Sequence, residues 1–266
     1  MPLAVCATPI GNLEDITLRV LRELAEADVV LCEDTRHTRK LLERHGLRAR
    51  LLSYHEHNEA RRTAELLPRL EGGERIALVS DAGLPAISDP GARLIGAALA
   101  AGIAVTVLPG ASAVETALVA SGLVADRYQF VGYLPRGERA LRTLAEEVAS
   151  WPHVVVAFES PRRLRRSLRV LARVIPDRPA AVCRELTKRF EEVERGSVAD
   201  LAERGEGVKG EITLVLGAAQ PARPDESAAT TAVAELVAAG VSRRQAADLV
   251  ARLTGASRNR LYRESL

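Results

Sequence analysis

Short apolar runs alternate along the first half of the chain with stretches whose apolar residues recur every three or four positions. The runs predict strands and the periodic stretches predict helices. Strands are expected at 3–7, 29–32, 76–80 and 104–108, and helices at 16–27, 36–45, 91–101 and from Ser112 onward. This alternation predicts a largely parallel sheet, with a ligand site formed by the loops at the carboxyl ends of its strands.

The second half shows a different spacing. Strands are expected at 129–134, 154–158, 180–184 and 211–217, helices at 138–149 and 161–174, and a polar stretch at 190–198. This order favours a second α/β unit with more antiparallel or hairpin character.

Two prolines, Pro221 and Pro224, predict a linker, and the region 227–266 after it has the pattern of three helices. Within that region, Ser242 and Gln245 have the spacing of a capping box. We therefore expect an N-terminal α/β domain at 1–110, a second α/β domain at 111–220 and a helical domain at 225–266.

Composition changes this picture only through the basic residues. Of 266 residues, 47% are hydrophobic and 27% are charged, as in ordinary folded domains, and the net charge of +2 excludes a strong global basic field. The basic residues are 34 arginines and only three lysines, Lys40, Lys188 and Lys209. A compositional bias of the source explains most of this imbalance. Lysines that persist under such a bias are expected where only a compact ammonium fits.

The sequence predicts a cytoplasmic protein. Each cysteine lies in an apolar run, which predicts buried free thiols in a reducing compartment, and no signal peptide is apparent. The uncharged segment 94–114 is long enough to cross a bilayer. Gly102 and the pair Pro109–Gly110 interrupt it, so we predict a helix, a turn, a strand and a second turn, all buried, and no membrane span.

Three loops of small and turn-forming residues follow predicted strands of the first half and are expected to meet at one edge of the sheet. They contain Pro9, then Ser80, Asp81, Ala82 and Gly83, and then Pro109, Gly110, Ser112 and Ala113. The first loop lacks the GxGxxG fingerprint of dinucleotide-binding proteins. Asp81 is predicted to accept hydrogen bonds from a ligand, whereas Asp89 is predicted to cap the next helix, with Pro90 at its first position.

Charged residues also close several strands. Glu33 and Asp34 suit acid–base chemistry, with stabilisation of a helix N-terminus as the alternative. Other strand ends in the second half carry Phe158, Glu159, Glu185, Leu186, Lys188, Gly210, Glu211 and Ile212. Surface turns with weak salt bridges are the alternative there. His55 and His57 suggest a metal site, but Asn58 is a good helix N-cap and no third ligand has suitable spacing, so we expect no metal.

In this order, the segments TPIGNLEDIT, CEDTRHT, HEHNE, SDAGLPAISDPG, PGASAV, FESPRR, RELTK and KGE closely resemble the ribosomal RNA small subunit methyltransferase I family. The resemblance covers essentially the whole chain. It implies the tetrapyrrole methylase fold, with two α/β domains, a donor-binding cleft between them and a small helical C-terminal domain, usually as a homodimer. Two positions depart from the family pattern, since Leu84 replaces a usual Thr and Phe158 stands where Tyr is common.

The resemblance further implies S-adenosylmethionine as methyl donor. The implied acceptor is the ribose 2′-oxygen of a decoding-centre cytidine in 16S rRNA, within the small ribosomal subunit. The donor pocket is expected to contain Pro9, Ser80, Asp81, Ala82, Gly83, Pro109, Gly110, Ser112, Ala113, Phe158, Glu159, Leu186, Gly210, Glu211 and Ile212. Because a ribose hydroxyl is a weak acid, a base or a nearby cation should help it ionise. We expect that group among Glu33, Asp34, Glu185 and Lys188.

Arginines concentrate in the predicted helix 161–174 and in the C-terminal region. Phosphate contacts are expected from Arg162, Arg163, Arg166, Arg243, Arg244, Arg258 and Arg260, with Tyr262 beside them. Solvated helix faces are the alternative.

Two other functions fit parts of the sequence. A tetrapyrrole or other small-molecule methyltransferase on the same fold would need no basic surface. The opening TPIGNLEDIT, in place of the glycine-rich loop of corrin-modifying relatives, favours an RNA acceptor. A DNA-binding helix-turn-helix protein is the alternative without enzymatic activity, but it leaves the loops of the first 220 residues unexplained.

Overall fold

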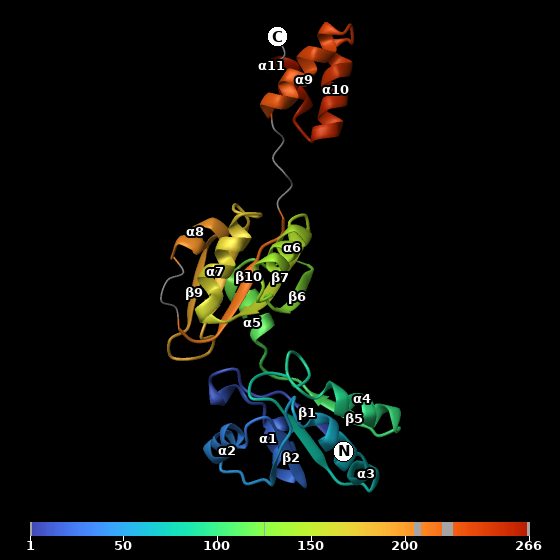
Figure 1. Cartoon of the computed structure of the whole chain (residues 1–266), viewed down its shortest axis with the longest axis vertical. Helices are drawn as coiled ribbons and strands as arrows, with labels where there is room; N and C mark the ends of the chain where they lie inside the picture. The colour runs from blue at the N-terminus through green and yellow to red at the C-terminus, as the bar shows by residue number, and fades with distance from the viewer. Residues whose placement is uncertain (1, 125, 205–208, 220–225, 265–266) are drawn as a thin grey trace. The chain divides into compact units, whose positions relative to one another are not determined.

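The computed structural model describes residues 2–124, 126–204, 209–219 and 226–264 (Figure 1). The chain divides into two compact units, Met1–Ala218 and Ala219–Leu266. The first unit contains two five-stranded sheets, and the second is helical in its described part. The predicted linker prolines Pro221 and Pro224 lie outside the described residues.

The first sheet is parallel throughout, in the order β3-β2-β4-β1-β5. Its strands are β1 (Leu3–Cys6), β2 (Val29–Cys32), β3 (Leu51–Ser53), β4 (Ile76–Val79) and β5 (Val105–Leu108). The central strands β1, β2 and β4 are buried along their whole length. Because helices cover both faces of a parallel sheet, such strands show continuous apolar runs in the sequence. The predicted parallel sheet is confirmed.

Helices pack on both faces of this sheet. They are the 3₁₀ turn η1 (Leu13–Asp15), α1 (Leu18–Glu26), α2 (Thr35–Arg44), α3 (Glu59–Glu71) and α4 (Ala92–Ala100). Apolar residues of α1 and α2 form one core cluster with the sheet, and those of α3 and α4 form a second. The short strand β3 was not among the predicted elements, whereas α3 begins at Glu59, directly after the predicted N-cap Asn58.

The predicted cap of α4 is wrong. The helix begins at Ala92 and its N-cap is Gly91, so Asp89 lies in the preceding turn and does not cap it. Gly91 has φ of 139°, and a Cβ at this position would come within 2.9 Å of Leu78 Cδ2. The chain therefore enters α4 through a turn that requires glycine, and this turn moves Asp89 away from the helix end.

Segment 94–114 forms the predicted helix, turn and strand, but the prediction that all of it is buried is wrong. Strand β5 lies at the edge of the sheet, where Val107 is 51% exposed, and Leu99 on α4 is 59% exposed. No helix among the described residues is long and apolar enough to cross a membrane.

The second sheet has the order β6-β7-β10-β8-β9. Its strands are β6 (Tyr128–Tyr133), β7 (Val154–Glu159), β8 (Pro179–Arg184), β9 (Glu192–Ser197) and β10 (Ile212–Leu216). Only the β6–β7 pair is parallel, and the other pairs are antiparallel, as predicted for this half. The polar stretch 190–198 contains the edge strand β9, whose position at the edge permits its polar sequence.

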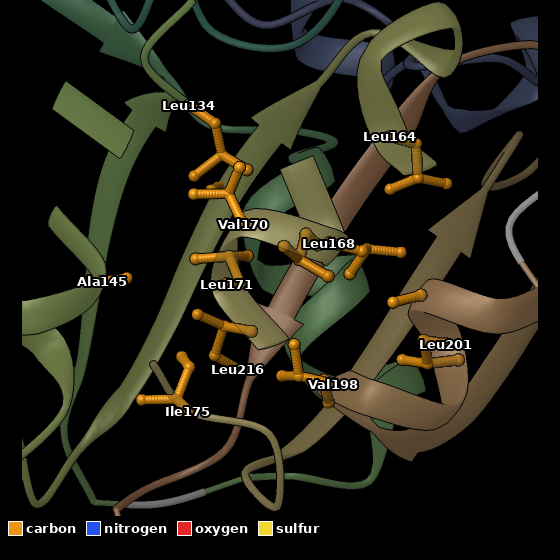
Figure 2. Close-up of a cluster of buried hydrophobic side chains, with 14 of the residues drawn as sticks. Leu134, Ala145, Leu164, Leu168, Val170, Leu171, Ile175, Val198, Leu201 and Leu216 are labelled. Carbon is orange, nitrogen blue, oxygen red and sulfur yellow. The ribbon is translucent and has the colours of Figure 1, made fainter. Parts of the chain in front are cut away.

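Helices cover both faces of the second sheet as well. They are α5 (Ala113–Ser121), α6 (Glu138–Val148), α7 (Pro161–Ala172) and α8 (Val198–Arg204). On one face, Leu164 and Leu168 of α7 pack with Leu216 of β10 and Leu201 of α8 (Figure 2). On the other face, α5 packs against the sheet in a separate core cluster.

A buried arginine binds backbone oxygens of several segments at the end of this sheet, and we expect its replacement to lower the stability of the fold. Arg178 is 6% exposed, and its guanidinium donates to the backbone oxygens of Gly217 (2.6 Å), Val148, Trp151 and His153. Arg178→Ala leaves these oxygens without their donor, so we expect a loss of about 2 to 4 kcal/mol in the free energy of unfolding. Urea unfolding measures it.

Arg173→Ala is the matched control, because Arg173 is exposed and, among the described residues, forms an ion pair only with Glu138 at the surface. It should cost less than about 1 kcal/mol. Equal losses in the two variants would contradict a structural role for Arg178.

The second unit contains α9 (Glu226–Ala238), α10 (Arg243–Thr254) and α11 (Arg258–Glu264), which share a small apolar core. The predicted capping of α10 is confirmed, since the hydroxyl oxygen of Ser242 accepts from the Gln245 N–H. Gly255, with φ of 74°, ends the same helix in the left-handed conformation.

Candidate active site

The three glycine- and proline-containing loops of the first sheet meet, as predicted. Thr8 and Gly83 exchange two backbone hydrogen bonds of 2.8 and 3.0 Å. A Cβ on Gly83 would lie 3.8 Å from the Ala111 oxygen and from Ile10 Cγ2. All three loops therefore converge at Gly83, whose φ of 76° suits glycine.

A cavity of about 540 Å³ lies beside these loops and is also lined by the second sheet. Of the expected donor-pocket residues, its wall contains Asp81, Ala82, Gly83, Ser112, Ala113, Phe158, Glu159, Leu186, Gly210, Glu211 and Ile212. The volume is in the range of pockets for cofactor-sized ligands, and the wall combines apolar, small and charged groups.

Four expected pocket residues are not part of the cavity wall. Pro9, Ser80, Pro109 and Gly110 lie in the supporting loops instead. The Ser80 hydroxyl donates to the Gly83 oxygen at 3.1 Å, and a Cβ on Gly110 would lie 2.9 Å from Ala7 Cβ. Both residues therefore stabilise the conformation of the loops without facing the cavity.

Three carboxylates gather at one side of the cavity: Glu33, Asp81 and Asp89. Burial, with the negative charge of Asp81, raises the pKa of Glu33. Burial, with the charges of Glu33 and Asp81, raises the pKa of Asp89 to about 7. A carboxyl group with such a pKa can exchange a proton near neutral pH, which is the property expected of an acid–base residue.

Asp89 is the functional candidate that the sequence interpretation missed. The motif SDAGLPAISDPG pointed to this stretch, but Asp89 precedes Pro90, and a pair of this kind is typical of a helix N-cap. The wall also contains Leu84, which departs from the family pattern, and Ile87 and Tyr133, whose apolar or aromatic character gave no sign of a site.

Asp34, which was expected among the acid–base residues, is placed differently from Glu33. It is the N-cap of α2, and its carboxylate binds the Arg36 guanidinium at 2.7 and 3.0 Å. These bonds hold the pKa of Asp34 well below its ordinary value. Asp34 is also absent from the cavity wall, so its position does not support a role as proton acceptor.

On the side formed by the second sheet, Lys188 bridges two carboxylates. Its Nζ lies 3.0 Å from Glu185 Oε1 and 2.8 Å from Glu211 Oε2, and Glu211 is part of the cavity wall. Burial lowers the pKa of Lys188, but the hydrogen bonds to Glu211 and Glu185 outweigh it and raise the pKa overall. Lys188 is therefore a cation at neutral pH.

The turn that carries Lys188 packs tightly against the first loop. A Cβ on Gly11 would come within 2.5 Å of Lys188 Cγ and 2.7 Å of Thr187 Oγ1, and the Asn12 N–H donates to that Oγ1 at 2.9 Å. Glu185 and Thr187 both have positive φ values, of 49° and 65°. This constrained turn fixes the Lys188 stem beside the cavity.

Glu159 serves the fold at the edge of the site. Its buried carboxylate accepts from the Ser160 N–H at 2.6 Å and from the Ser167 hydroxyl, and it pairs with Arg163 at 2.5 Å. Arg163 also donates to the Leu134 oxygen at 3.3 Å. Both charged groups are thus engaged within the protein, so the expected phosphate contact of Arg163 is not supported.

Other arginines of α7 face solvent. Arg162, Arg166, Arg169 and Arg173 are exposed and share one helix face by their spacing, although Glu138 pairs with Arg166 and Arg173. In the C-terminal unit the expected RNA-binding residues differ in their exposure and in their ion pairs. Arg244 and Tyr262 are exposed and Arg243 is partly buried, whereas Arg258 pairs with Asp248, and Arg260 pairs with Glu226 and Glu264.

The two histidines considered as metal ligands lie close together. The rings of His55 and His57 are 5.9 Å apart, and the Asn58 side chain contacts His55 Nε2 at 3.0 Å. Among the described residues, no group of three or more His, Cys, Asp or Glu side chains could hold a metal ion.

Comparison with known proteins agrees with this architecture. Residues 2–202 match the family model "Tetrapyrrole (Corrin/Porphyrin) Methylases", and residues 224–266 match "RsmI C-terminal HTH domain". The methyltransferase CobJ (TM-score 0.64, 20% identity) covers 83% of this chain and 95% of its own. Uroporphyrin-III C-methyltransferase from Thermus thermophilus, crystallised with S-adenosyl homocysteine (TM-score 0.57, 22% identity), covers 81% and 96%.

Fold and cavity together define a protein of the tetrapyrrole methylase class. Two similar relatives are proteins named ribosomal RNA small subunit methyltransferase I. The one from Mesorhizobium japonicum is 45% identical over 99% of this chain and 91% of its own, and the one from Pseudomonas aeruginosa is 40% identical over 99% and 96%. The chain belongs to the ribosomal RNA small subunit methyltransferase I family.

Proposed function

We propose that this chain transfers a methyl group from S-adenosylmethionine to the ribose 2′-oxygen of a decoding-centre cytidine in 16S rRNA. The observation that carries the proposal is the 45% identity to a relative named for small-subunit rRNA methylation, over almost the entire length of both chains. The proposed setting is cytoplasmic, with the small ribosomal subunit as partner and a homodimer as the working assembly.

The cavity fits such a donor. Ala82, Gly83 and Gly210 offer backbone without bulky side chains, so a flat ring system can lie close to the chain. The carboxylates of Glu33, Asp81 and Asp89 suit a ligand that carries an ammonium and a sulfonium group. When bound, S-adenosylmethionine supplies an electrophilic methyl group.

The protein must then orient the acceptor and remove its proton. Positioning supplies up to about 7 to 11 kcal/mol in well-oriented reactions. We propose Asp89 as the proton acceptor, because burial, with the charges of Glu33 and Asp81, raises its pKa to about 7. Lys188, held by Glu185 and Glu211, supplies a fixed positive charge beside the cavity that favours an ionised hydroxyl.

The C-terminal unit is proposed to dock the RNA. Deletion of 225–266 removes the exposed Arg244 and Tyr262, so affinity for small subunits should fall by about 10-fold or more at low salt, and less at high salt, as phosphate contacts require. Equilibrium binding at several salt concentrations measures this. The deletion should leave S-adenosylmethionine affinity unchanged, and unchanged subunit affinity would contradict the docking role.

The test of the proposed function begins with calorimetric titration of S-adenosylmethionine, which a DNA-binding protein without methyltransferase activity would not bind. Methyl transfer is then measured with small ribosomal subunits, free 16S rRNA and a porphyrinogen as acceptors. Transfer to the rRNA supports the proposal. Transfer to the porphyrinogen alone would instead assign the small-molecule activity of the fold neighbours.

A further inference from the structure

Tyr133 is an exposed aromatic residue in the wall of the cavity. It is 62% exposed, in a chain with only 3% aromatic residues. It ends strand β6, where it is paired with Phe158 of β7. The two rings meet edge to face with centroids 5.5 Å apart, and Phe158 meets Phe130 in the same manner at 4.9 Å. These edge-to-face contacts hold the Tyr133 ring at the cavity, while much of the Tyr133 side chain stays exposed to solvent.

The segment after Tyr133 leads to the basic face of α7. The Leu134 oxygen accepts from Arg163 in the first turn of α7, and Glu138 at the start of α6 pairs with Arg166 and Arg173. These contacts hold the loop 134–137 and the beginning of α6 against α7.

Exposed arginines occupy both sides of this junction. Arg136 and Arg139 follow Tyr133 in the chain, and Arg162 and Arg169 lie on the outer face of α7. No ion pair to any of these four is present within the part of the chain that the structure describes, so they are available to an external anion. Arg136 and Arg139 place positive charge shortly after Tyr133 in the chain, and Tyr133 itself is in the cavity wall.

We propose that Tyr133 stacks on the base of the target nucleotide and that Arg136, Arg139, Arg162 and Arg169 bind the phosphates of the adjoining single-stranded RNA. Aromatic faces beside basic side chains are the usual means of binding unpaired RNA, since every base can stack and every phosphate is an anion. We call this surface the RNA track. It rests on the proposed function, because it assumes that the acceptor enters the cavity from RNA.

Tyr133 borders the same cavity as the donor, so the experiment must separate the two ligands. Affinity for a short, unstructured, fluorescein-labelled RNA that contains cytidine is measured by anisotropy, and affinity for S-adenosylmethionine by calorimetry, with the full chain. Tyr133→Ala should weaken RNA binding by roughly 5- to 150-fold, the range for loss of one stacked base, and leave donor affinity unchanged. Tyr133→Phe, which keeps the ring, should bind RNA like the wild type.

The arginines are tested by salt dependence. Arg136→Ala and Arg162→Ala should each reduce the slope of log affinity against log salt by about 0.7, the value for one phosphate contact on a single strand. Arg22→Ala is the matched control, since Arg22 is an exposed arginine on α1. It should leave the slope unchanged.

Several outcomes overturn the RNA track. A loss of donor affinity in Tyr133→Ala would mean that the ring contacts the donor. Unchanged affinity for both ligands would mean that Tyr133 contributes to binding of neither. An effect of Arg22→Ala equal to that of Arg136→Ala would mean that the RNA binds through non-specific electrostatic attraction. Absence of RNA binding by the wild type would refute the RNA track. Methylation at a site other than a ribose, with the Tyr133 and arginine effects intact, would refute the proposed function and leave the track standing.

Discussion

Asp89→Asn is expected to lower the rate of methyl transfer at saturating substrates by about 100- to 10,000-fold, the usual contribution of a positioned general base. Asparagine has almost the same size but cannot accept the proton. Asp89 is suited to this role because burial and the charges of Glu33 and Asp81 raise its pKa to about 7. At that value it is more basic than an ordinary carboxylate and still ionised in part at neutral pH. Transfer to small subunits measures the loss.

The same shift predicts the pH dependence. The rate of the wild type should rise through a pH of about 7 as Asp89 loses its proton, and Asp89→Asn should lack this rise. Glu33→Gln removes a negative neighbour, so the pKa of Asp89 should fall and the rise should move to lower pH. An unchanged profile in Glu33→Gln would contradict the coupling of the two groups.

The stability of Asp89→Asn, measured against pH, shows whether a slower variant has lost catalysis or has lost its fold. The folded chain keeps the Asp89 proton up to about 7, whereas an ordinary carboxyl with pKa 3.8 releases it earlier. Charging Asp89 therefore costs folding free energy as the pH rises from about 4 to about 7, and stability falls in that window. Asp89→Asn removes this cost and should be at least as stable as the wild type above neutral pH. Asp177→Asn, at an exposed carboxylate, should change neither rate nor stability.

Lys188→Met is expected to reduce the transfer rate by about 10- to 100-fold, because it removes a fixed charge from the border of the cavity. The carboxylates of Glu185 and Glu211, at 3.0 and 2.8 Å from Nζ, then lose their shared cation. Repulsion between them should also widen this part of the wall. The measurement is kcat together with S-adenosylmethionine affinity.

Lys188→Arg is the sharper form of the same test. The Lys188 stem is tightly packed, since even a Cβ on Gly11 would overlap its Cγ at 2.5 Å. A longer, planar guanidinium should therefore fail to restore full activity. Lys40, exposed on α2, is the matched control, and neither Lys40→Met nor Lys40→Arg should alter the rate. Full activity in Lys188→Arg would mean that the retention of lysine here is a coincidence.

The order of elements and most of the cavity wall were accessible from the sequence. Buried parallel strands require continuous apolar runs, and loops after such strands meet at one sheet edge, so Asp81, Gly83 and Ala113 could be placed together. The strand β3 escaped prediction because three half-buried residues, Leu51–Ser53, carry too short a pattern.

The errors arose where tertiary packing outweighs local preference. Asp89 before Pro90 suits a helix N-cap, yet the helix α4 begins only after Gly91. Asp89 instead lies near Asp81 of its own loop and Glu33 of a distant one. Arg163 resembles its exposed neighbours in sequence but pairs with buried Glu159. The two residues are four positions apart, so their spacing permits the pair, but it does not show that Glu159 is buried and therefore requires a cationic partner.

The chemical identity of the methylated nucleoside tests the proposed rRNA methylation most directly. The chain is incubated with S-adenosylmethionine and small ribosomal subunits that lack the modification, and the rRNA is digested to nucleosides for mass spectrometry. We expect 2′-O-methylcytidine from 16S rRNA, and its absence in a parallel reaction with Asp89→Asn. A methyl group on a base, or no transfer to rRNA alongside transfer to a porphyrinogen, would contradict the proposed function.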